Sequence, residues 1–128
     1  SVTMEKRTMK KSIGKLECVF GMPKSMSTVW DVFYMISTNP NRAQLGRLFA
    51  GLVGVTIQNQ PTCPKYSISD CDLMAYGGRV QEWIAGHKGN PIEILEVGTE
   101  LFQMMSEHIS TDKEVESAEN FSSDPPVE

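Results

Sequence analysis

The 128-residue sequence predicts a single small α+β domain, in which an antiparallel sheet packs against two or three helices and both termini are disordered. Its 40% hydrophobic composition suffices for one core, and the length is short for a second domain. Near the N-terminus apolar residues alternate with polar ones, which is typical of a strand. Later in the chain they recur at helical spacing. We therefore expect a flexible basic arm at 1–12, a globular domain at 13–108 and a disordered acidic tail at 109–128.

The first 22 residues divide into the arm and a strand. Residues 1–12 are polar and contain Lys6, Arg7, Lys10 and Lys11, which predicts a mobile segment. After them, apolar side chains recur at every second position, which indicates a half-buried strand. Its inward positions are Leu16, Cys18, Phe20 and Met22.

The next segment predicts a helix that ends near Asn39. Thr28 followed by Asp31 resembles a weakened capping box, and Pro40 disfavours helical geometry in the residue before it. Between them the apolar residues fall on one helical face. They are Val29, Val32, Phe33 and Ile36.

A second helix is predicted to start at Asn39–Pro40 and to become a strand from Gly54. Its apolar stretch, "GRLFAGLVGVTI", is shorter than the roughly 20 residues that a bilayer span needs. We interpret Gly46, Ala50 and Gly54 as a groove where the first helix or the sheet approaches closely. The residues expected to supply core are Leu45, Leu48, Phe49 and Leu52.

Three further elements are predicted. "KYSIS" alternates like a strand, and "LMAYGGRVQEWI" indicates two strands joined by a tight turn at Gly77–Gly78. From Asn90 the pattern becomes helical, with an apolar side and an acidic side. The acidic side consists of Glu93, Glu96, Glu100 and Glu107. The residues after His108 are mostly acids, serines and prolines. This segment cannot bury enough apolar surface to offset the entropy lost on ordering.

The sequence contains no constellation typical of catalysis or metal binding. His87 and His108 have no neighbours at ligand spacing, and Cys71 lies between Asp70 and Asp72, which disfavour its thiolate. An acidic row along a helix normally faces water. We therefore expect a non-enzymatic protein without cofactor or metal. Three cysteines without a CxxC pair favour a reducing compartment.

Charge is divided along the chain. Residues 1–47 carry eight Lys/Arg against three Asp/Glu, whereas residues 48–128 carry four against thirteen. This division predicts that residues 1–47 contact an anionic surface. The surface is either a layer of lipid headgroups or nucleic acid that is bound non-specifically. It also suits head-to-tail self-association, and an uneven charge that serves only solubility is the alternative.

A proline-framed loop, "PTCP", comprises Pro61, Thr62, Cys63 and Pro64. It resembles the P-T/S-A-P motif by which viral proteins recruit host budding machinery, with Cys63 in the place of alanine. A plain turn is the alternative, because prolines favour turns.

The order of features resembles the core of rhabdovirus matrix proteins over about residues 13–70. The strand "GKLECVF", the helix "STVWDVFYMIS", the polar break "TNPN", the apolar "RAQLGRLFAGLVGVTI" and "KYSIS" follow one another as in that family. The chain departs from the family in lacking a PPxY motif, since "DPPVE" has no tyrosine.

The resemblance implies a structural protein of the virion and host cytoplasm. Such a protein lies at the inner face of the host membrane, self-associates and binds the nucleocapsid during assembly and budding. The positions matching the basic membrane-binding arm are Lys6, Arg7, Lys10, Lys11 and Lys15. The alternative is an adaptor or host-antagonist module that binds a basic partner through the acidic helix face and tail.

Overall fold

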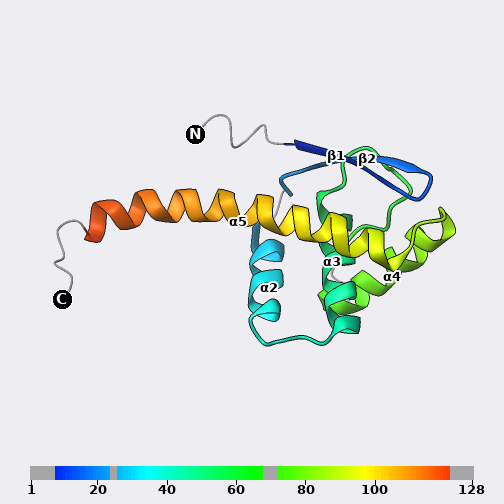
Figure 1. The fold of residues 1–128 in the computed structure, drawn as a ribbon, viewed down its shortest axis with the longest axis horizontal. Coiled ribbons are helices and arrows are strands. Elements are labelled where there is room, and N and C mark those ends of the chain that lie inside the picture. The colour runs from blue at the N-terminus through cyan, green and yellow to red at the C-terminus, as the bar shows by residue number, and fades with distance from the viewer. Residues whose placement is uncertain (1–7, 24–25, 68–71, 122–128) are drawn as a thin grey trace.

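The computed structural model describes residues 8–23, 26–67 and 72–121, with side chains described up to Glu107 (Figure 1). The predicted α+β class is confirmed: the described residues form a two-stranded antiparallel sheet and four helices. The elements are β1 (Thr8–Ile13), β2 (Leu16–Gly21), α2 (Met26–Ile36), α3 (Arg42–Thr56), α4 (Leu73–Gly86) and α5 (Pro91–Phe121).

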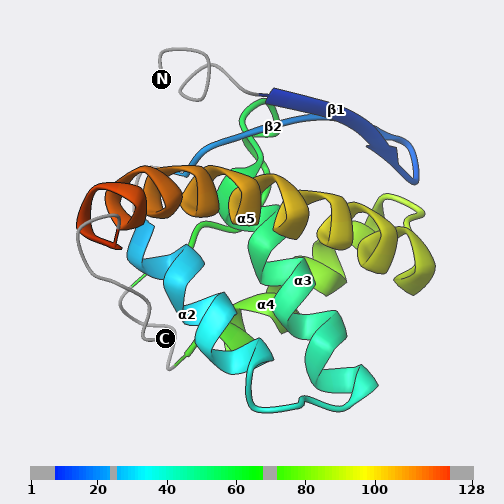
Figure 2. The ribbon, with the colours of Figure 1, turned by 60° about the vertical axis from the view of Figure 1, so that its left-hand side comes forward.

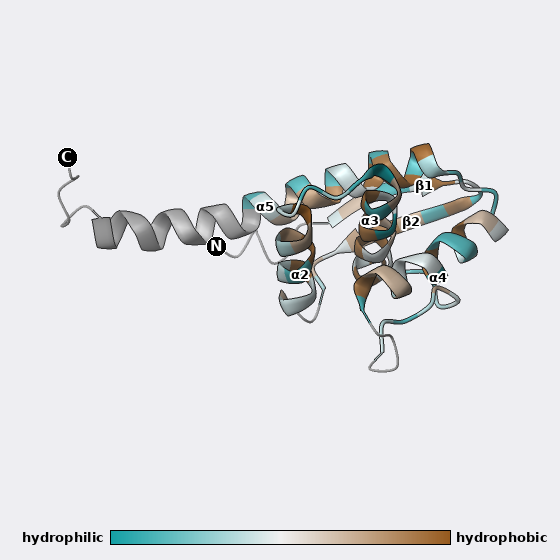
Figure 3. Ribbon diagram, turned by 90° about the horizontal axis from the view of Figure 1, so that it is seen from below, coloured by the Kyte–Doolittle hydropathy of each residue, from teal (hydrophilic) through white to brown (hydrophobic). Residues whose placement is uncertain are grey.

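Helix α3 lies at the centre of the arrangement and contacts α2, α4, α5 and β2. Helix α5 crosses over α2 and α3, and the β1–β2 hairpin lies on top, with β1 next to α5 and β2 next to α3 (Figures 1 and 2). Hydrophobic residues recur on α3, β2 and the first turns of α5, and these elements form the core together with α2, α4 and the end of β1 (Figure 3). The hairpin therefore covers a helical core.

The core contains most of the side chains predicted for it. Leu16, Cys18 and Phe20 are buried, as their alternation predicts. Leu48 and Leu52 of α3 are fully buried as well. Burial of such side chains contributes roughly 1.5–3 kcal/mol each, so this cluster dominates the stability of the domain.

The prediction that residues 8–12 belong to a mobile arm is wrong, because they form β1. Thr8 pairs with Gly21 and Ile13 pairs with Leu16 across the hairpin. Ile13 is fully buried, so the strand contributes to the core although its composition is mostly polar. Residues 1–7, and with them Lys6 and Arg7, lie outside the described residues.

The predicted strands at 73–84 are wrong too, because this segment is the single helix α4. Its buried positions recur with the period of a helix and lie on one face. They are Leu73, Tyr76, Gly77, Val80 and Ile84. The Gly77–Gly78 pair, which indicated a turn, lies inside the helix, where Gly77 lets the backbone of Arg47 approach closely.

Helix α3 continues to Thr56, whereas the sequence predicted a strand from Gly54. The Thr56 hydroxyl donates to the carbonyl of Leu52 at 2.8 Å, which accommodates this β-branched residue in the last turn. Ile57, directly after the helix, forms an isolated bridge with β2, opposite Phe20. The predicted "KYSIS" strand does not form at 65–67, and 68–71 lie outside the described residues.

Both predicted helix starts are shifted. Helix α2 begins at Met26, so Thr28 is a buried residue of its first turns and not its cap. Helix α3 is capped by Asn41, whose side chain accepts from Gln44 N at 2.8 Å while the Gln44 side chain accepts from Asn41 N at 2.9 Å. This reciprocal capping box satisfies two backbone donors and moves the start two residues past Asn39.

The predicted disordered tail differs from the structure over 109–121, where α5 continues to Phe121. A helix that is already nucleated by packing extends without a new nucleation cost. The residues "TDKEVESAE" include the good helix formers Ala, Glu and Lys. Residues 122–128 lie outside the described residues.

Candidate functional site

The predicted basic group is split by the structure. Lys10 and Lys11 are neighbours in β1, so their side chains point to opposite faces of the hairpin. Lys11 Nζ lies 3.1 Å from Glu100 Oε2 of α5. Lys10 is exposed on the other face, beside Thr8 and Ser12. Of these two lysines, Lys10 is the one presented to a partner, because Lys11 has an intramolecular counter-charge.

The hairpin turn, which contains Lys15, is held by the end of α4 and the start of α5. Gly14 N donates to both carboxylate oxygens of Glu93 at 3.1 Å, and Lys15 N donates to the carbonyl of His87 at 2.9 Å. Glu93 N also donates to Asn90 Oδ1 at 2.9 Å, while Asn90 N donates to Glu93 Oε1 at 3.1 Å. The acidic row therefore does not simply face water, since Glu93 and Glu100 hold the hairpin.

The outer edge of β2 is closed by the segment after α3. Gln58 N donates to the carbonyl of Val19 at 2.8 Å, and Val19 N donates to Asn59 Oδ1 at 2.9 Å. Asn59 Nδ2 donates to the carbonyl of Glu17 at 2.9 Å, and Gln60 Nε2 reaches the same oxygen at 3.0 Å. These amide side chains replace a third strand, so β2 has no free edge here.

The "PTCP" loop is attached to α4. Trp83 Nε1 donates to the Thr62 hydroxyl at 3.0 Å, and the Tyr76 hydroxyl donates to the carbonyl of Pro64 at 2.7 Å. Cys63 is buried between them. A partner that read these four residues as an extended peptide would have to break both hydrogen bonds, so the geometry favours the structural turn.

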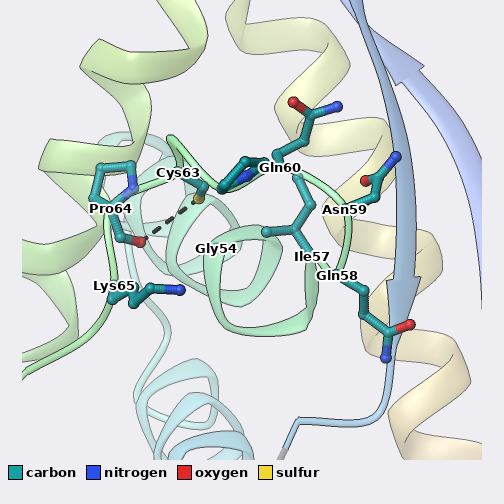
Figure 4. A pocket seen from close by; sticks show the side chains of 9 residues that line it. Gly54, Ile57, Gln58, Asn59, Gln60, Cys63, Pro64 and Lys65 are labelled. Carbon is teal, nitrogen blue, oxygen red and sulfur yellow. Dashed lines mark hydrogen bonds between the residues drawn. The ribbon is translucent and has the colours of Figure 1, made fainter.

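A concavity of about 390 Å³ lies between this loop and the end of α3 (Figure 4). It is lined by Gly54, Ile57, Gln58, Asn59, Gln60, Pro61, Cys63, Pro64 and Lys65. A second hollow of about 540 Å³ shares part of this lining and continues to Tyr66. The polar side chains that line the first hollow are three amides, one lysine and one thiol. They do not include a paired general acid and general base.

The thiols near this site are not nucleophiles at neutral pH. Burial raises the pKa of Cys18 and of Cys63 from 9.0 to about 11, and the nearby Cys18 adds to the rise at Cys63 while Lys65 opposes it. Both thiols therefore stay protonated, and the thiolate is the reactive form. Among described residues, no three His, Cys, Asp or Glu side chains are grouped to hold a metal ion. Cys71 is outside the described residues.

Helix α2 presents two exposed aromatic side chains, Trp30 and Tyr34, outside the apolar face predicted for it. Trp30 is 51% exposed and Tyr34, one turn later, is 68% exposed. Phe33, on another side of the helix, packs on Phe102 of α5 with ring centroids 4.7 Å apart. Trp30 and Tyr34 are four residues apart and outside the apolar face of the helix. This spacing in the sequence could have predicted an exposed aromatic surface.

None of the described helices combines the length and apolarity required to cross a bilayer. No family model, no curated protein and no solved structure matches this chain. The rhabdovirus matrix resemblance therefore stays a prediction based on the sequence pattern.

Proposed function

We propose that this chain is a viral matrix-type structural protein that self-associates and bridges the anionic inner leaflet and the nucleocapsid during assembly and budding. The observation that carries the proposal is the separation of charge. Residues 1–47 have a net charge of +5, whereas α5 contains eight Asp/Glu and one lysine, Lys113. A basic front is attracted to anionic headgroups by about 1 kcal/mol per side chain near the surface.

The arrangement of the elements supports head-to-tail attraction between copies. Lys10 and Lys15 are exposed on the hairpin. The second half of α5, orange to red in Figure 1, extends beyond the other elements. The acidic extension of one copy can therefore approach the basic hairpin of the next without disturbing either core.

This function places the protein at the inner face of the host membrane, in the virion and in the host cytoplasm. Its partners are then anionic lipid, other copies of the chain and the viral nucleocapsid. Contact with nucleic acid would be non-specific, because it would rest on the attraction between lysine side chains and phosphates.

Vesicle binding tests the proposal. The full chain should bind phosphatidylserine vesicles at low salt and release them as salt rises. Replacing Lys10 and Lys15 with Ala should weaken binding by at least about tenfold. As a matched control, replacing Arg42 and Lys113 with Ala removes the same charge elsewhere and should change binding by less than about threefold. Absence of vesicle binding at low salt would overturn the proposal.

A second candidate function, an adaptor or host-antagonist module, is favoured by the exposed Trp30 and Tyr34 on α2. Exposed aromatic residues are enriched at protein interfaces. In this function the acidic face and extension of α5 bind a basic partner protein. Deleting residues 109–128 separates the two: loss of partner capture with vesicle binding intact favours the adaptor, and the reverse favours the matrix function.

A further inference from the structure

The outer edge of β1 differs from that of β2 because, among the described residues, no backbone hydrogen bond from another segment closes it. In an antiparallel pair, residues alternate between those bonded to the opposite strand and those whose N–H and C=O point outward. Glu17 and Val19 use their outward groups for Asn59. Their partners across the hairpin are Ser12 and Lys10, so the backbone groups of these two residues point outward from β1.

The same alternation applies to Thr8, which pairs with Gly21. Within the described part of the chain, no backbone hydrogen bond joins Thr8, Lys10 or Ser12 to another segment at this edge. All three residues are exposed. A row of unpaired amides and carbonyls on an exposed strand is a template for an added strand.

We propose that the β1 edge binds an extended, acidic peptide segment of a partner protein, which adds a third strand to the sheet. The backbone of Thr8, Lys10 and Ser12 supplies the hydrogen bonds, and the Lys10 ammonium selects an acidic side chain on the outer face. Opposite charges across neighbouring strands stabilise the pair, so charge complementarity sets both the preference and the register.

The other face of the added strand has a different requirement. On that face β1 presents Lys11, which is already paired with Glu100, above the acidic row of α5. An incoming acid there would lie close to Glu100, so neutral or apolar side chains fit better. In the recognised segment, acidic residues therefore alternate with apolar ones. The acidic side chains lie on the outer face of the sheet and the apolar side chains on the face toward α5.

A second copy of β1 is a poorer occupant than an acidic strand. Two β1 strands paired antiparallel around their centres would place Lys10 opposite or diagonal to Lys10 of the other copy. Like charges at such positions are destabilising. Lysines on an edge strand commonly prevent self-pairing for this reason.

The test uses the full chain and a fluorescent probe peptide of alternating Glu and Val with blocked ends. Ser12→Pro removes an outward N–H and adds bulk at the edge, but keeps every charge and the β1–β2 ladder. It should weaken probe binding by roughly tenfold or more, measured by fluorescence anisotropy, whereas Ser12→Ala should bind like the parent chain. Thr8→Pro provides the same test if Ser12→Pro fails to fold by circular dichroism.

Charge is tested separately. Lys10→Glu should weaken probe binding by about tenfold, because it places like charges across the new strand pair. Arg42→Glu, at the start of α3 on the side of the domain opposite the hairpin, makes the same change in net charge and should have little effect (Figure 1). Equal losses for the two variants would show a diffuse charge effect and overturn the proposal.

Two further outcomes would also contradict it. Binding of an N-methylated probe, which cannot pair along the backbone, with unchanged affinity would exclude strand addition. Loss of self-association in Ser12→Pro during sedimentation would show that a second copy occupies the edge. Vesicle binding should survive Ser12→Pro, so failure of this proposal is distinguishable from failure of the matrix function.

Discussion

Gly77 and Gly86 belong to the same helix, α4, but have opposite surroundings. A Cβ on Gly77 would clash with the carbonyl oxygen of Arg47 in α3, and this backbone atom cannot move aside easily. A Cβ on Gly86 would meet nothing within 4 Å. The absence of a side chain is therefore required at the first position and only reduces helix stability at the second.

This contrast gives a matched pair of substitutions. Gly77→Ala should lower the free energy of unfolding by about 2–4 kcal/mol, because α3 and α4 must separate. Gly86→Ala should raise it by about 0.5–1 kcal/mol through helix propensity. Urea unfolding followed by circular dichroism measures both, and a stable Gly77→Ala would contradict the close packing of α3 on α4.

The buried thiols make stability depend on alkaline pH. With the pKa of Cys18 and Cys63 at about 11 when folded and 9.0 when exposed, the folded state retains protons that the unfolded state loses. Stability from these thiols is thus complete below pH 9.0 and falls toward pH 11, by at most about 3 kcal/mol for each thiol. Urea unfolding of the parent and of a Cys18→Ala, Cys63→Ala variant at about pH 8 and about pH 10 should show a smaller loss in the variant.

At the scale of elements, Glu93 links the start of α5 to the hairpin. Its carboxylate accepts from Gly14 N in the turn and from Asn90 N at the helix start. One side chain therefore satisfies a capping position and fixes a tertiary contact. Glu96, one turn away in the acidic row, is exposed and has no such bonds.

Glu93→Ala should accordingly destabilise the domain by about 1–2 kcal/mol, since it removes a cap and leaves Gly14 N without its acceptor. The matched control, Glu96→Ala, should stay within about 0.5 kcal/mol of the parent. Amide hydrogen exchange at the turn, together with urea unfolding, checks the assignment. Equal exchange protection in the two variants would show that Glu93 does not hold the hairpin.

At the scale of the whole molecule, exposed lysines lie on the hairpin and acidic residues run along α5. The hairpin presents Lys10 and Lys15, whereas α5 carries eight acids and projects beyond the other elements (Figure 1). Within one copy the two regions touch through Lys11 and Glu100. Lys10 and Lys15 of the hairpin and Glu96 of α5 are exposed.

Sedimentation at low and high salt tests whether copies use this complementarity. The full chain should form larger species as concentration rises at low salt and should return to the monomer at high salt, because exposed charges are screened. Deletion of residues 109–128 should remove most of the effect. A chain that stays monomeric at every concentration and salt would contradict the self-association part of the matrix function.

Prediction from the sequence succeeded where apolar residues recur on one face of a single strand or helix. The alternation of Leu16, Cys18 and Phe20 indicated β2, and the periodicity of Leu48 and Leu52 indicated α3. The candidate site was predicted less well. Lys10 and Lys11 were grouped by composition, although their opposite directions on β1 follow only once the strand is known.

The sequence by itself determined the fold class, the core faces of β2 and α3 and the division of charge, because these depend on periodicity and composition alone. The tertiary structure decided the rest. Gly77–Gly78 became the middle of a helix because α3 offers a surface that only glycine can approach, and β1 formed because β2 and α5 supply its partners. Long-range contacts of this kind outweigh weak local propensities, and they also left one edge of the hairpin open.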